Sequence, residues 1–154
     1  RTEERLERIE EVVEKLAQTT KQLAVHISGL SDTVGFGLED IARIVVPGYL
    51  ERHEKIYMGE FERRFIYLDG KEEIEIDLWA ETEREKKKLL IIGEVKSRIY
   101  SAEVKRFISR VIEPVRAMEM DKEIYPLMFG YVVHPSAQAM AQEAGIHLIA
   151  SYQR

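Results

Sequence analysis

Glu94 and Lys96 stand where a buried strand is expected to end, and both side chains can take part in charged chemistry. They directly follow the apolar run Leu89–Ile92 and Gly93. Glu and Lys are almost never buried without a partner, so their position needs an explanation. Residues two positions apart in a strand lie on the same face of a sheet, which brings Glu94 and Lys96 together.

Asp77 is expected to join these two residues through a β-hairpin. Residues 71–80 alternate between apolar and polar side chains, which predicts a half-buried strand, and residues 89–96 form the next strand. Antiparallel pairing about a centre between residues 85 and 86 places Asp77 opposite Glu94. Two carboxylates and one ammonium group would then meet at the end of an apolar sheet.

Two carboxylates that face each other repel, so either Lys96 or a divalent cation must neutralise them. The two carboxylates, the Val95 carbonyl and water form a hard oxygen site that suits Mg²⁺ or Mn²⁺. The alternative is a cross-strand salt bridge between Lys96 and one carboxylate at a partly exposed sheet edge. The three residues alone leave both interpretations open.

The elements that must position these residues follow the pattern of an α/β fold. A helix over residues 38–52 is expected to bend or split at Pro47. Beyond it we expect a mixed sheet flanked by helices. The predicted strands are 61–67, 71–80, 89–96, 126–133 and 146–150, with a charged hairpin tip at 81–88. In the strand 71–80, the side chains expected on one face are Ile74, Ile76, Leu78 and Ala80. Two further helices are expected to begin at Ser101 and Ser136.

The first 34 residues carry a heptad repeat of apolar residues. Mostly β-branched residues at its a positions and mostly Leu at its d positions favour a parallel two-stranded coiled coil. We therefore expect an oligomerisation helix over residues 1–34, a dimer formed through residues 5–34, and a hinge at Gly35–Gly37. Three or four strands, or docking on the protein's own body, stay open. The repeat consists of Leu6, Ile9, Val13, Leu16, Thr20, Leu23, Ile27, Leu30 and Val34.

Composition excludes several classes of protein. The absence of Cys rules out a disulfide scaffold, a thiolate zinc site and a cysteine nucleophile. A formal net charge of −5 does not support a generally basic nucleic-acid binder. The longest apolar run is far too short to span a membrane, so we expect a cytoplasmic protein. Many charges and no Asn favour a thermophilic source, and the start at Arg1 suggests a piece of a longer protein.

The segments 75–80 (Glu-Ile-Asp-Leu-Trp-Ala) and 89–97 (Leu-Leu-Ile-Ile-Gly-Glu-Val-Lys-Ser), in this order of elements, resemble the PD-(D/E)XK nuclease superfamily. The likeness extends over about residues 36–150. Within the superfamily, the chain is similar to an archaeal group of nuclease-like proteins with an N-terminal coiled coil. The resemblance implies a restriction-endonuclease-like core over residues 35–154. The Pro of the motif's name is replaced here by Ile76.

The resemblance also implies roles for individual residues. Asp77 and Glu94 would bind the metal ion, and Lys96 would assist the attacking water. Glu39, on the helix before the sheet, corresponds to an acidic residue that many relatives use as an extra metal ligand. An acidic residue in the first turn of a helix is equally explained by the helix dipole.

Four basic residues are candidates for contacts with nucleic-acid phosphates: Arg98, Lys105, Arg106 and Arg110. For each of them, a solvated surface position is the alternative. The expected function is a Mg²⁺- or Mn²⁺-dependent nuclease that hydrolyses phosphodiester bonds in DNA and dimerises through its N-terminal helix. The alternative function is a non-catalytic nucleic-acid-binding or assembly module on a nuclease-like core.

Overall fold

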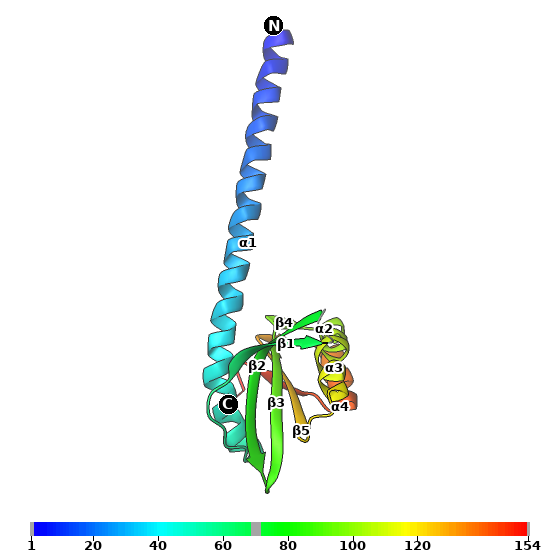
Figure 1. The fold of residues 1–154 in the computed structure, drawn as a ribbon. Helices are drawn as coiled ribbons and strands as arrows, with labels where there is room; N and C mark the ends of the chain where they lie inside the picture. The colour runs from blue at the N-terminus through cyan, green and yellow to red at the C-terminus, as the bar shows by residue number, and fades with distance from the viewer. Residues whose placement is uncertain (1, 69–71, 154) are drawn as a thin grey trace. The chain divides into compact units, whose positions relative to one another are not determined.

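The computed structural model describes residues 2–68 and 72–153, without the side chains of residues 21 and 23–36. Contacts divide the chain into two units, residues 1–34 and residues 35–154. Helix α1 (Thr2–Glu54) begins in the first unit and ends in the second (Figure 1). In the described ranges, no helix is both long and apolar enough to cross a membrane.

A hinge was expected at Gly35–Gly37 and a bend or split at Pro47, but the helix is interrupted at neither place. Helix α1 runs through all of these positions. A proline inside a helix costs about 3 kcal/mol. On both sides of Pro47, Ala42, Val46 and Leu50 are completely buried against the sheet. Fully burying an aliphatic side chain of the size of Val or Leu contributes about 1.5–3 kcal/mol, so packing outweighs helix propensity here.

The second unit is built on a five-stranded mixed sheet with the order β1-β2-β3-β5-β7. The first three strands pair antiparallel as a meander, and β3, β5 and β7 run parallel. The predicted fold class, an α/β core with a mixed sheet flanked by helices, is confirmed. The strands are β1 (Glu62–Leu68), β2 (Glu72–Arg84), β3 (Lys87–Val95), β5 (Glu123–Gly130) and β7 (His147–Ala150).

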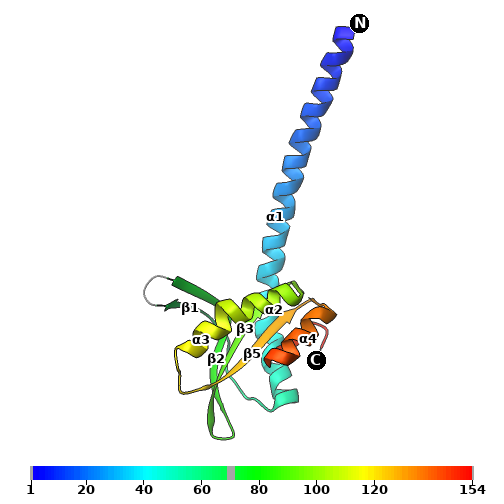
Figure 2. The ribbon, with the colours of Figure 1, turned by 90° about the vertical axis from the view of Figure 1, so that its right-hand side faces the viewer.

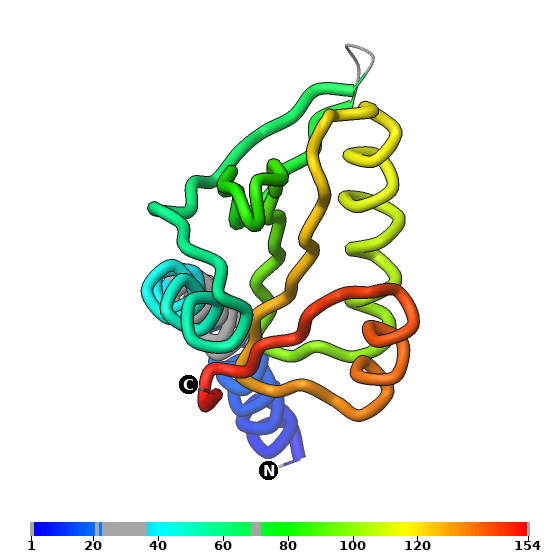
Figure 3. The backbone as a smooth tube through the Cα atoms, turned by 90° about the horizontal axis from the view of Figure 1, so that it is seen from below, coloured from blue at the N-terminus to red at the C-terminus, as the bar shows by residue number. Residues whose placement is uncertain are grey.

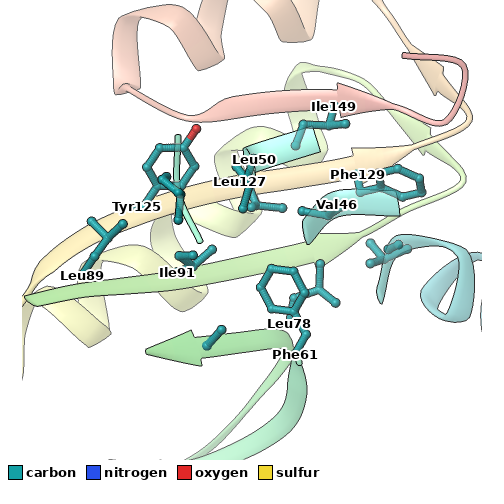
Figure 4. Packing of buried hydrophobic residues seen from close by; sticks show 14 of the residues in the cluster. Val46, Leu50, Phe61, Leu78, Leu89, Ile91, Tyr125, Leu127, Phe129 and Ile149 are labelled. Atoms are coloured by element: carbon teal, nitrogen blue, oxygen red, sulfur yellow. The ribbon is translucent and has the colours of Figure 1, made fainter. Parts of the chain in front are cut away.

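Helices cover both faces of this sheet (Figures 2 and 3). The C-terminal part of α1 packs on one face and, together with the strands, forms a first apolar layer (Figure 4). A second apolar layer forms on the other face. There the covering elements are α2 (Ser101–Phe107), the π-helical turn η1 (Ile108–Ile112), α3 (Glu113–Ala117) and α4 (Pro135–Ala144), and the short strands β4 (Arg98–Ile99) and β6 (Val132–Val133) pair beside them.

The hairpin of β2 and β3 has the predicted register, with Leu78 opposite Gly93 and Thr82 opposite Leu89. The charged tip expected over residues 81–88 is shorter than predicted, because pairing continues to Arg84 and Lys87. The two residues of the turn, Glu85 and Lys86, have φ values of 53° and 67°. Positive φ at both central residues is the conformation of a type I′ turn, which connects hairpin strands without splaying them.

Replacing Glu85 by Asn and Lys86 by Gly is expected to raise the free energy of unfolding by about 1 kcal/mol. Asn and Gly adopt positive φ at less cost than Glu and Lys. Urea denaturation of the double variant measures the change. The control places the same two residue types at paired strand positions, as Glu83→Asn with Lys88→Gly, and should lower the stability. Higher stability of this control, or no increase in stability for the turn variant, would contradict the type I′ turn.

Strand β2 departs from strict alternation at Asp77. Glu62 pairs with Trp79, and Arg64 pairs with Ile76, so Asp77 and Leu78 both lie opposite the single residue Arg63. This is the arrangement of a β-bulge, in which one strand contains an extra residue.

The bulge overturns the prediction that Ile74, Ile76, Leu78 and Ala80 share one face. Ile74 and Ile76 pack in the second apolar layer, whereas Leu78 and Ala80 pack in the first. The extra residue shifts the phase of the strand by one position, so the side chains on either side of it point to opposite faces. Bulges are frequent beside active sites because they redirect a side chain.

Candidate active site

A cavity of about 690 Å³ opens where β2 and β3 stop pairing. It brings together Asp77, Glu94, Lys96 and Glu39, which the sequence singled out, and Val95 lies between two of them. Arg110 also lines the cavity, whereas Arg98, Lys105 and Arg106 lie outside its lining. The lining consists of Glu39, Leu68, Glu72, Glu73, Ile74, Glu75, Asp77, Glu94, Val95, Lys96, Ser109, Arg110, Val111 and Pro114.

Asp77 is fixed between the ends of the two strands. Its Oδ2 atom accepts a hydrogen bond of 3.0 Å from the backbone N–H of Val95. The side chain at the bulge thus takes the place that a backbone carbonyl of β2 would have in a regular ladder. Burial raises the pKa of the Asp77 carboxyl, while the hydrogen bond from Val95 and the charge of Arg63 lower it.

Glu94 lies on the adjacent strand and is coupled to Asp77 by charge. Burial raises the pKa of the Glu94 carboxyl to about 7, against the lowering effect of Lys96. The carboxylate of Asp77 raises this pKa further, and Arg106 and Arg110 lower it. The two carboxylates therefore form a poorly solvated pair for which a nearby cation is favourable.

The backbone of Lys96 is held against strand β5. Its N–H donates to the carbonyl of Phe129 at 3.0 Å. A Cβ atom added to Gly130 would stand 2.5 Å from the Lys96 carbonyl oxygen, so a glycine is required at this close approach. Gly130 is a residue that the sequence analysis missed, because a glycine in a strand does not show which backbone passes beside it.

Gly130→Ala is expected to lower the free energy of unfolding by about 1–3 kcal/mol, the typical cost of forcing an extra methyl group into a packed site. The added methyl group would stand too close to the Lys96 carbonyl oxygen, so the backbone must shift, and it would also press on the Ile99 side chain at 3.0 Å. Urea denaturation measures the loss. Gly59→Ala is the matched control, since its new Cβ would have no heavy atom within 4 Å. Equal stability of the two variants would contradict the close approach.

Glu39 lies in the cavity lining, and its carboxylate is paired with arginines. Arg63 donates from Nη2 to Glu39 and from Nη1 to Glu75, and Arg43 lies 3.8 Å from Glu39. Its role as a metal ligand stays a prediction. Arg63 was missed because nothing in the sequence distinguishes it from the neighbouring Arg64; its partners on α1 and β2 are brought to it by the fold.

The helical segment after Ser101 contributes one wall of the cavity, and it contains a π-helical turn that the sequence analysis did not predict. The N–H of Glu113 bonds to the carbonyl of Ile108, five residues earlier. The signal was Pro114, which has no N–H to donate to the carbonyl of Arg110, four residues before it. Such turns inside helices are frequent at functional sites, and this one places Arg110 in the cavity lining.

The oxygen atoms of this site fit a hard divalent cation such as Mg²⁺ or Mn²⁺. These ions are often held by one or two carboxylates, with water and substrate oxygens completing the coordination. Within the part of the chain that the structure describes, no three Asp, Glu, His or Cys side chains are grouped to hold a metal ion. The ligand set predicted from the sequence, Asp77, Glu94 and the Val95 carbonyl, would leave the remaining coordination positions to water and substrate, and it stays a prediction.

Neither a family model nor a curated protein matches this chain. Among solved structures, the chain is similar to the crystal structure of a repair endonuclease from Pyrococcus abyssi, with 13% sequence identity and a TM-score of 0.37. The match covers 71% of this chain and 45% of that one, so this chain spans less than half the length of the endonuclease. A likeness at this TM-score carries no argument about the site, and membership of the PD-(D/E)XK superfamily stays a prediction.

Proposed function

We propose that this protein is a Mg²⁺- or Mn²⁺-dependent nuclease that hydrolyses phosphodiester bonds in DNA. One observation carries the proposal: Asp77, Glu94 and Lys96 line a single cavity at the ends of two adjacent strands. Both carboxylates are poorly solvated, and the charge of Asp77 raises the pKa of the Glu94 carboxyl, so a cation beside them is favourable. A salt bridge alone would not need a second carboxylate beside the first.

Each residue has a separate task in this proposal. Asp77 and Glu94 would hold the cation with the Val95 carbonyl. When bound, such a cation neutralises charge on a phosphate and lowers the pKa of a coordinated water. The Lys96 ammonium would donate hydrogen bonds to that water or to the scissile phosphate. A positioned donor of this kind typically contributes about 10²–10³-fold to the rate.

The charges around the cavity make substrate binding depend on the cation. Among the residues that the structure describes, six carboxylates line the cavity, from Glu39, Glu72, Glu73, Glu75, Asp77 and Glu94. Two cationic side chains of the described ranges, Lys96 and Arg110, also line it. An anionic substrate is attracted only after part of this negative charge has been neutralised. Because Arg110 lines the cavity, it would contact the phosphate nearest to the reaction, and Arg98, Lys105 and Arg106 would contact phosphates further away.

Self-association through the N-terminal helix is the second part of the proposal. In the single chain, Leu6, Ile9, Val13 and Leu16 are 55–62% exposed at heptad spacing. A row of exposed aliphatic side chains along one helix face favours pairing with a second copy of the same helix. A parallel dimer formed by residues 5–34 would bury them.

The proposed activity is tested with end-labelled linear, nicked, flapped and four-way DNA incubated with Mn²⁺. The wild-type protein should cleave at least one substrate, and excess chelator should stop the reaction. Glu94→Gln, which keeps the shape of the side chain and removes its charge, should be inactive. DNA binding without cleavage of any substrate and without Mn²⁺ binding would contradict the proposal and favour a non-catalytic module.

A further inference from the structure

Arg63 joins two carboxylates of the proposed active site to one guanidinium group. It lies on β1, and it contacts Glu39 of α1 through Nη2 and Glu75 of β2 through Nη1. The side chains of Arg63 and Glu39 are 28% and 16% exposed, so this contact is largely shielded from water. Both carboxylates line the cavity that contains Asp77.

The position of Arg63 follows from the same bulge that places Asp77. Arg63 is the single β1 residue opposite Asp77 and Leu78. Its charge lowers the pKa of the Asp77 carboxyl, while Glu75 raises it. The guanidinium therefore acts on the proposed metal-binding carboxylate as well as on its own two partners.

The negative charges of the cavity explain why Glu39 and Glu75 need a positively charged partner. Without Arg63, four carboxylates of one cavity would repel each other: Glu39, Glu75, Asp77 and Glu94. Arg43 reaches Glu39 at 3.8 Å, on the same helix, and no contact joins it to Glu75 among the described residues. Arg63 thus contacts two of these four carboxylates and places one positive charge between them.

We infer that Arg63 occupies the place of a second divalent cation, so that the site holds one metal ion per chain, between Asp77 and Glu94. The inference rests on the proposed function and deepens it. The Glu39 and Glu75 oxygens that contact Arg63 are paired with a guanidinium group, which is always charged. Unlike a metal ion, this group is part of the chain and cannot dissociate when metal is scarce. A guanidinium neutralises charge, but it does not coordinate and activate a water molecule. Glu39 would then serve Arg63 and not the metal ion.

The test counts the Mn²⁺ ions bound by the full chain, using calorimetric titration and electron paramagnetic resonance of the free ion. Wild type is expected to bind one Mn²⁺ per chain. Arg63→Gln should gain a second, weaker site, because Glu39 and Glu75 are released. Arg64→Gln is the matched control, because it removes the same charge one residue further on. The Arg64 guanidinium lies 4.7 Å from the centre of the Trp79 ring. This variant should still bind one Mn²⁺ per chain.

Two further variants keep the test decisive if Arg63→Gln does not fold. Glu75→Gln and Glu39→Gln, each with Arg63 intact, should still bind one Mn²⁺ per chain, since neither residue is a ligand in this scheme. The loss of one nearby negative charge should weaken the affinity only slightly. A marked loss of affinity in either variant would overturn the inference.

The remaining outcomes separate this inference from the proposed function. Two Mn²⁺ ions in wild type, or a single ion in folded Arg63→Gln, would overturn the inference and leave the metal-dependent nuclease intact. No bound Mn²⁺ in wild type would overturn both.

Discussion

Lys96→Ala is expected to slow Mn²⁺-dependent DNA cleavage by about 10²–10³-fold and to leave the affinity for Mn²⁺ unchanged. Lys96 lines the cavity together with Asp77 and Glu94, and the proposed partners of its ammonium group are the attacking water and the phosphate. Losing it removes a hydrogen-bond donor from the transition state without removing a metal ligand. Single-turnover cleavage measures the rate, and calorimetric titration measures the affinity.

Two comparisons make this expectation specific. Asp77→Ala should lose both metal binding and cleavage, because its carboxylate is a proposed ligand. Lys87→Ala removes the same kind of charge from an exposed position outside the cavity lining, and its cleavage rate should stay close to that of wild type. If Lys96→Ala cleaves as fast as Lys87→Ala, then Lys96 has no part in catalysis.

The double substitution Ile9→Asp with Leu16→Asp is expected to convert a dimer into a monomer. These side chains are 59% and 62% exposed in the single chain, and both occupy d positions of the heptad repeat. Fully burying each aliphatic side chain contributes about 1.5–3 kcal/mol, and a dimer interface would bury four of them. Charged residues at the d positions would in addition repel each other across the seam.

Sedimentation equilibrium distinguishes the two states. The matched control is Arg8→Asp with Lys15→Asp, which adds two aspartates at outer positions of the same heptads and should leave the dimer intact. A wild-type monomer, or a dimer that survives the Ile9→Asp and Leu16→Asp changes, would show that the exposed apolar row is not a self-association surface.

Local pattern was sufficient to predict the β2–β3 hairpin and, through it, the meeting of Asp77 with Glu94. Alternation set the strands, the positions of the two apolar runs set the register, and both were borne out by the pairing of Leu78 with Gly93. The details that shape the cavity were not predictable in this way. The bulge at Asp77 depends on the pairing of β2 with β1 on its other side, which the hairpin pattern does not contain.

The continuity of helix α1 and the contacts of Arg63 were missed for related reasons. Glycine and proline are good signals of a helix end, but the burial of Val46 and Leu50 against the sheet offsets their cost in α1. Arg63 contacts a residue 24 positions earlier and another 12 positions later, so no short-range spacing points to it. Both the continuous helix and the contacts of Arg63 depend on interactions between segments far apart in the sequence. Such interactions form only in the complete fold.

The claim at the centre of this account is that Asp77 and Glu94 hold one divalent cation beside Lys96. Anomalous diffraction at the manganese absorption edge, from crystals of the full chain soaked in Mn²⁺, tests it most directly. We expect one anomalous peak per chain in the cavity, at about 2.0–2.5 Å from carboxylate oxygens of both Asp77 and Glu94. A cavity without a peak under saturating Mn²⁺, or a peak coordinated by other residues, would contradict the account.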